Sequence, residues 1–133
     1  GKKELFTGLA METLETEWKE YPVLHLDLNA RNYDSKEALV AILNQHLEKW
    51  EAKYGDEKKE RSPEERFSYL LERIHEASGS QVVILIDEYD KPLLQTIGDE
   101  DLQEQYKNIL KAFIHVANVT VIPRQMRMLL LCV

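Results

Sequence analysis

The chain has 133 residues, of which 44% are hydrophobic and 31% are charged, with 5 glycines and 4 prolines. This composition excludes a disordered, collagen-like or low-complexity chain, and the length predicts a single domain over residues 1–133. The formal net charge of −7 disfavours direct binding of nucleic acid, because the summed field of the protein repels phosphate groups.

The first half of the chain predicts short helices, a strand and a long helix. Residues 5–18 place apolar side chains at spacings of three and four, which predicts one or two short helices. Apolar and polar residues alternate over residues 23–29, as in a strand with one buried face. Asp34 and Glu37 predict the N-cap of a helix that ends at Gly55, with an apolar stripe made of Leu39, Leu43, Leu47, Trp50 and Tyr54.

The second half predicts two helices and two strands. Residues 62–65 combine a serine N-cap, an early proline and the glutamate of a capping box, which predicts a helix start. Residues 82–86 are apolar at every position, as in a strand buried on both faces. A helix over residues 102–114 and a last strand at about residues 125–133 complete a predicted three-layer α/β arrangement with a mostly parallel sheet.

Three carboxylates follow the buried strand, at Asp87, Glu88 and Asp90. An apolar run followed by Asp-Glu is the pattern of a Walker B strand, in which Asp87 would hold Mg²⁺ and Glu88 would polarise the attacking water. Asp27, at the end of the earlier strand, is expected at the same sheet edge. A solvated acidic turn without function explains the same pattern equally well, and Asp90 to Pro92 is also ordinary turn chemistry.

Other chemical signals in the sequence are weak. No glycine-rich phosphate loop of the form GxxxxGK[ST] occurs, so a nucleotide site in these residues would be half present. The four histidines have no metal-ligand spacing and are interpreted as packed or interfacial side chains: His25, His46, His75 and His115. A single cysteine, Cys132, and the absence of a signal peptide or membrane-length apolar run predict a cytoplasmic protein without a membrane partner.

Several segments resemble the AAA-ATPase-like family, bacterial proteins that usually carry a PD-(D/E)xK nuclease-like domain at the C-terminus. The resemblance covers residues 1–117, and its most specific motif is VVILIDEYDKPL at residues 82–93. It is also carried by KKELFTGL (2–9), WKEYPVLHLD (18–27) and SPEERF (62–67). The resemblance implies Mg²⁺ and ATP as cofactors of the full-length protein, with Glu88 as the catalytic base and Asp87 as the metal ligand. We expect Asp27, Asp87 and Asp90 to be the cofactor-binding residues, and a plain strand exit is the alternative for Asp27.

The resemblance also implies a P-loop NTPase fold of the AAA-like, additional-strand type. In the family the phosphate loop precedes sequences like residues 1–9, so residues 1–133 are expected to be a partial domain that is inactive in isolation. The strand that feeds the phosphate loop lies beside the sensor strand in such folds. Without it, Met126 to Leu131 would form an open apolar edge, and we expect self-association through that edge.

Two other functions stay open on the sequence alone. The first is a non-catalytic interaction module whose sheet and helices mediate assembly. The second is metal-dependent nuclease chemistry, which is weaker because Glu88 and Lys91 do not give the Glu-x-Lys spacing and the chain is acidic.

Overall fold

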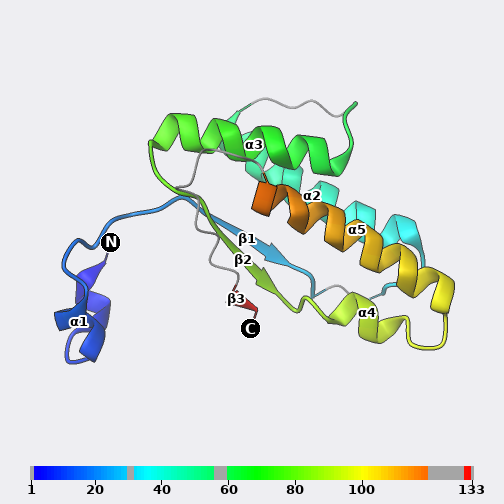
Figure 1. The fold of residues 1–133 in the computed structure, drawn as a ribbon, viewed down its shortest axis with the longest axis horizontal. Helices are drawn as coiled ribbons and strands as arrows, with labels where there is room; N and C mark the ends of the chain where they lie inside the picture. The colour runs from blue at the N-terminus through cyan, green and yellow to red at the C-terminus, as the bar shows by residue number, and fades with distance from the viewer. Residues whose placement is uncertain (1, 30–31, 56–59, 120–130, 133) are drawn as a thin grey trace.

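The computed structural model describes residues 2–29, 32–55, 60–119 and 131–132. Its elements follow the predicted order, with one additional short helix after the central strand (Figure 1). Most of the last predicted strand lies outside the described residues. In chain order the elements are η1 (Lys3–Phe6, a 3-10 helix), α1 (Ala10–Leu14), β1 (Val23–Asp27), α2 (Lys36–Tyr54), α3 (Pro63–Ser78), β2 (Val83–Asp87), α4 (Lys91–Gln95), α5 (Glu100–Val119) and β3 (Leu131–Cys132).

The three strands form a parallel sheet in the order β1-β2-β3. β1 and β2 pair residue by residue, from Val23 opposite Val83 to Asp27 opposite Asp87. The pairing continues past the end of β1, where the Leu28 amide donates to the Asp87 carbonyl over 3.0 Å. The predicted α/β class with a parallel sheet is therefore confirmed.

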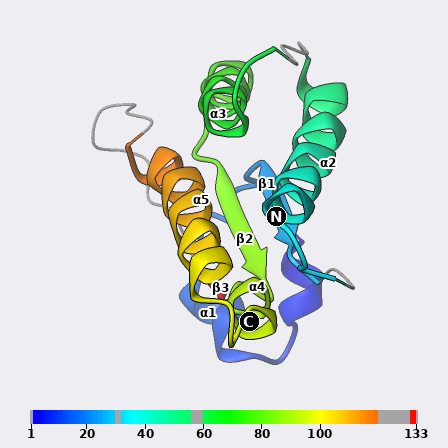
Figure 2. The same cartoon turned by 90° about the vertical axis from the view of Figure 1, so that its right-hand side faces the viewer.

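One face of the sheet carries the core. The helices α2, α3 and α5 cover this face (Figures 1 and 2). The side chains of β1 and β2 on it are at most 4% exposed and share one core cluster with these helices: Leu24, Leu26, Ile84 and Ile86. On the opposite face Val23, His25 and Asp27 are exposed, and β2 is half-buried. The apolar run of β2 predicted burial on both faces, and in the described residues only one face is fully buried. The second helical layer of the predicted three-layer arrangement is not found among these residues.

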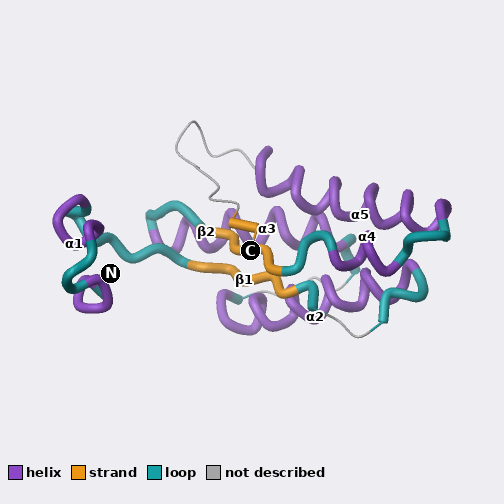
Figure 3. The backbone as a smooth tube through the Cα atoms, turned by 90° about the horizontal axis from the view of Figure 1, so that it is seen from below, coloured by secondary structure: helices purple, strands orange, loops and turns teal. Residues whose placement is uncertain are grey.

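The helical layer is joined by aromatic contacts. Phe67 of α3 stacks on Phe113 of α5 with ring centroids 4.3 Å apart and ring planes 7° apart, and Trp50 of α2 lies 5.9 Å from Phe67. Such aromatic pairs contribute roughly 0.5–1.5 kcal/mol beyond the area that they bury. The three helices thus share one core with the sheet, while η1 and α1 lie apart from it, beyond the amino ends of the strands (Figure 3).

A buried ion pair fixes α2 against α3. The Arg66 guanidinium donates to both carboxylate oxygens of Glu51, over 2.9 and 2.6 Å, and to Asn44 Oδ1 over 2.7 Å. Arg66 and Glu51 are only 5% and 3% exposed, so removing either partner would leave a buried charge unpaired, which costs about 3–5 kcal/mol. No local sequence pattern predicts this pair, because its partners lie on different helices.

The starts of the long helices α2 and α3 differ in how well the sequence predicted them. Ser62 forms the predicted capping box, because its hydroxyl accepts from the Glu65 amide and the Glu65 carboxylate accepts from the Ser62 amide. The predicted N-cap at Asp34 is wrong by one residue: Ser35 is the N-cap of α2. The Tyr106 hydroxyl donates to the Ser35 carbonyl over 2.7 Å, so a tertiary contact with α5 helps to fix this helix start.

No helix in the described part of the chain combines the length and the apolar character needed to cross a lipid bilayer.

Candidate functional site

The carboxyl ends of β1 and β2 bring two predicted site residues together. Asp27 and Asp87 are direct partners in the parallel register, so both side chains emerge on the same face at the same edge of the sheet. The Asp87 side chain is 43% exposed, and its Oδ2 lies 3.9 Å from Nε2 of His25, which is two positions before Asp27 on β1. The edge is therefore polar, accessible and formed by residues from two strands.

Asp27 takes part in two hydrogen bonds, one local and one from α2. Its Oδ1 accepts from the Asn29 amide over 2.8 Å, which turns the chain at the end of β1. Its carbonyl lies 3.0 Å from Nε2 of His46 on α2, and because a carbonyl can only accept, Nε2 carries the proton. Burial lowers the pKa of His46 below its ordinary value, which favours the neutral ring. The helical layer thus contacts the site edge directly.

Glu88 adopts an unusual backbone conformation. Its φ is +55°, in the left-handed region that residues with a Cβ rarely occupy, and its side chain is exposed. The Lys91 amide donates to the Glu88 carbonyl over 3.1 Å, so residues 88–91 form a tight turn from β2 into α4. Backbone strain of this kind accumulates at functional sites. No sequence pattern predicts this conformation, because neither glycine nor asparagine occupies the position.

Asp90 and Lys91 begin the short helix α4. Asp90 is the N-cap residue of α4, but its side chain makes no capping hydrogen bond, and it is exposed. The Lys91 ammonium donates to the Asn29 side chain, which ties the start of α4 to the turn after β1. The structure thus brings Asn29 and Lys91 to the same edge as Asp27 and Asp87, whereas Lys91 was not among the predicted site residues.

The four histidines, predicted to be packed or interfacial, differ in exposure. His46 bonds to β1 as described, and His75 Nδ1 lies 2.9 Å from the Ser80 carbonyl at the end of α3. His25 and His115 are exposed, so neither is packed among the described residues, and an interfacial position stays a prediction for both. His25 instead belongs to the polar edge, because the diagonal geometry of neighbouring strands brings it near Asp87.

Comparison with known proteins decides the family. A family model described as Predicted AAA-ATPase matches residues 1–131. The chain belongs to this AAA-ATPase-like family. An uncharacterised protein in the vnfD 5′ region of Azotobacter chroococcum mcd 1 is 27% identical over 117 residues, which cover 84% of this chain. The chain spans only 22% of that protein. No solved structure matches the chain at a significant level.

Membership in the AAA-ATPase-like family confirms the family that the motif at residues 82–93 indicated and supports an ATPase-like function. Within the described residues no group of three or more histidine, cysteine, aspartate or glutamate side chains is arranged to hold a metal ion. Mg²⁺ that is bound together with a nucleotide takes only one or two protein carboxylates and completes its shell with phosphate oxygens and water. Asp27 and Asp87, which are partners in the sheet register, would supply the one or two carboxylates that such an ion takes.

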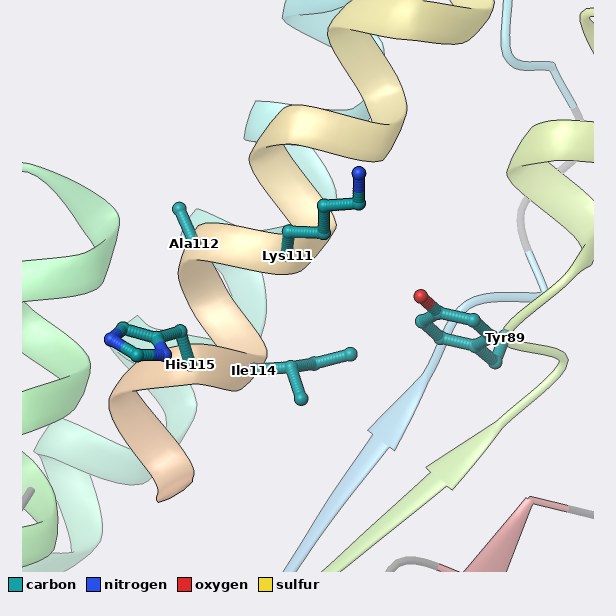
Figure 4. A pocket seen from close by; sticks show the side chains of 5 residues that line it. All are labelled: Tyr89, Lys111, Ala112, Ile114 and His115. Carbon is teal, nitrogen blue, oxygen red and sulfur yellow. The ribbon is translucent and has the colours of Figure 1, made fainter. Parts of the chain in front are cut away.

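A cavity lies beside the turn of residues 88–91 in this AAA-ATPase-like chain. It has a volume of about 490 Å³ and is lined by Tyr89, which follows Glu88, and by the last turns of α5. Figure 4 shows the Tyr89 ring directed toward α5, with Ile114 and Lys111 extending toward it from the helix. The lining is largely apolar and carries no carboxylate, so its chemistry differs from that of the Asp27 and Asp87 edge.

The strained backbone of Glu88 leads to a stability prediction. Replacing Glu88 by glycine removes the Cβ that makes φ +55° unfavourable, so Glu88→Gly should unfold with a free energy about 1 kcal/mol higher than Glu88→Ala. Urea denaturation of the two variants measures the difference. At the exposed Glu72 inside α3 the order should reverse, because glycine in a helix costs about 1 kcal/mol relative to alanine. Equal stability of Glu88→Gly and Glu88→Ala would show that residue 88 is not strained.

Proposed function

We propose that the edge formed by Asp27, Asp87 and Glu88 is the Mg²⁺-ATP edge of an AAA-like ATPase, with β2 as the Walker B strand. The observation that carries this proposal is the register of the sheet: Asp87 ends the central strand beside Asp27, and Glu88 follows in an exposed turn. Ligands of parallel sheets bind at this end of the strands. Family membership and the motif at residues 82–93 supply independent support.

The strand order supports a P-loop fold of the additional-strand type. β2 lies between β1 and β3, so β3 would be the sensor strand. The strand that feeds the phosphate loop would then lie on the far side of β3. We infer that residues 1–133 are the part of a three-layer α/β/α domain that lacks this loop, and that the half-buried sheet face is where its second helical layer would pack.

Each carboxylate has a distinct role in this proposal. Asp87 would hold the Mg²⁺ shell, and Asp27, its neighbour in register, would contact the metal's water or the nucleotide. Mg²⁺ supplies charge neutralisation on the phosphoryl oxygens when it is bound. Glu88, which is exposed at the turn, would accept a proton from the water that attacks the γ-phosphorus. We also propose that Asp90, two residues further along the turn, contacts the bound cofactor.

Phosphate binding is the part of the reaction that these residues do not provide. Backbone amides and a lysine of a phosphate loop supply much of the ground-state and transition-state stabilisation in P-loop enzymes. Residues 1–133 contain no such motif. We infer that the purified chain hydrolyses ATP at no more than the background rate.

Phosphate release by the purified chain, with Mg²⁺ and ATP, tests this inference directly. We expect no signal above buffer. Release that disappears in Glu88→Gln would contradict the inference, although it would support Glu88 as the base. If the whole gene product contains a phosphate loop, Glu88→Gln in that protein should lower the ATP turnover rate by at least about a hundredfold, while ATP binding persists. The matched variant Asp101→Asn, an exposed acid at the start of α5, should leave turnover unchanged.

Exposed apolar side chains favour a second function, an interaction module that assembles with other chains. Leu5, Leu9, Met11 and Leu14 in the N-terminal segment are between 50% and 78% exposed. Such clusters mark interaction surfaces in soluble proteins. If Glu88→Gln leaves every phenotype of the gene's product intact, this second function is favoured over the ATPase.

Self-association through the sheet edge at Met126 to Leu131 remains part of the proposal. Residues 126–130 lie outside the described residues, while Leu131 pairs with Leu85 of β2 in the last strand of the sheet order. Unpaired strand edges recruit other chains. Sedimentation velocity should therefore show species larger than a monomer at concentrations on the order of tens of micromolar, and a strict monomer would count against the proposal.

A further inference from the structure

The outer edge of β1 offers backbone groups to a further strand. In the described sheet β1 is a terminal strand, paired only with β2. Pro22 and Leu28 bond to β2 through their backbone groups, so alternate residues between them face β2 as well. The backbone of Val23, His25 and Asp27 therefore faces away from the sheet. The hydrogen bond from His46 to the Asp27 carbonyl confirms this direction, and it leaves Val23 and His25 as the residues that a new strand would pair with.

A groove runs along this edge, between β1 and α2. Two cavities of about 330 and 270 Å³ follow one another there and share Asp27, His46 and Lys49 in their lining. The wall on the α2 side also includes Trp50, Tyr54 and Lys53. The groove thus combines a free strand edge with aromatic surface from a neighbouring helix.

The charge of the groove is opposite to that of the molecule. The chain has 24 acidic residues against 17 lysines and arginines, yet the groove is lined by two exposed lysines and a single carboxylate, Asp27. The Lys53 ammonium lies 4.8 Å from the centre of the Tyr54 ring, which places it over the groove wall. Opposite charge across an interface steers and orients a partner. The charge of the groove therefore complements that of an acidic ligand.

We propose that this groove binds an extended, acidic polypeptide segment of a partner protein, which adds to β1 as a further strand. Main-chain hydrogen bonds to Val23 and His25 provide the register, and carboxylates on the segment pair with Lys49 and Lys53. Nucleic acid matches the lysines but not the row of backbone donors and acceptors, and the remainder of the acidic chain repels it. Asp27 lies both in this groove and at the proposed Mg²⁺-ATP edge. The peptide measurements below contain no nucleotide, so their failure is distinguishable from failure of the proposed ATPase function.

Fluorescence anisotropy with short labelled peptides tests the proposal on the whole chain. A peptide of alternating valine and glutamate should bind, and the corresponding valine and lysine peptide should bind at least about tenfold more weakly. A strand added to an edge pairs through only one of its own edges. N-methylation of one alternate set of peptide amides should therefore weaken binding by about tenfold or more, whereas methylation of the other set should have little effect.

Protein variants locate the site. The double variant Lys49→Gln and Lys53→Gln should weaken binding of the glutamate peptide and reduce its salt dependence, while Lys107→Gln with Lys111→Gln on α5 should not. All four lysines are at least partly exposed, so both variants are expected to fold, which circular dichroism verifies.

Four outcomes would overturn the proposal. They are equal binding of both peptides, equal effects of the two methylation patterns, tighter binding of a short oligothymidine than of the glutamate peptide, and no loss of binding in the Lys49 and Lys53 variant. Sedimentation distinguishes a second copy of the chain as the occupant. If the Lys49 and Lys53 variant loses self-association and the wild type binds no peptide, the groove is a homotypic interface and not a partner site.

Discussion

The in-register parallel pairing of β1 with β2 is the constraint on which the rest of the structure depends. Because side chains alternate along a strand, this register sends Leu24 and Ile84 into the helical layer and Asp27 and Asp87 to the opposite face. A slip of one residue would bury the carboxylates and expose the leucines and isoleucines. The burial of the core and the position of the polar edge are thus consequences of the same pairing.

The helical layer contacts the polar edge at the carboxyl ends of β1 and β2 through α2. The buried Arg66 and Glu51 pair fixes α2 against α3, and α2 carries His46, whose ring bonds to the Asp27 carbonyl. The same histidine ends the free part of the β1 edge. Helix packing, the polar edge and the proposed peptide groove are therefore connected through one side chain, and substitutions at His46 are expected to affect all three.

Sequence predicted the features that local patterns encode and missed those that depend on contacts between distant residues. The capping box at Ser62 and the apolar stripe of α2 are local, and both are present. The N-cap of α2 is Ser35 and not the predicted Asp34, and the Ser35 carbonyl accepts a hydrogen bond from Tyr106, far along the chain. Glu51 and Arg66 lie on different helices, so no periodicity predicted their pairing. The motif and the predicted parallel sheet placed Asp27 and Asp87 at the same sheet edge. No sequence signal indicated the left-handed backbone of Glu88.

The most direct measurement of the central claim uses Mn²⁺ as a paramagnetic substitute for Mg²⁺. We expect Mn²⁺ to broaden the amide NMR signals of residues 27–29 and 87–90 before any others. Asp87→Asn should remove this broadening, while Asp101→Asn should preserve it. Broadening that is centred on the acidic residues 99–101 at the start of α5, or that is unchanged in Asp87→Asn, would contradict the assignment of Asp87 as the metal ligand.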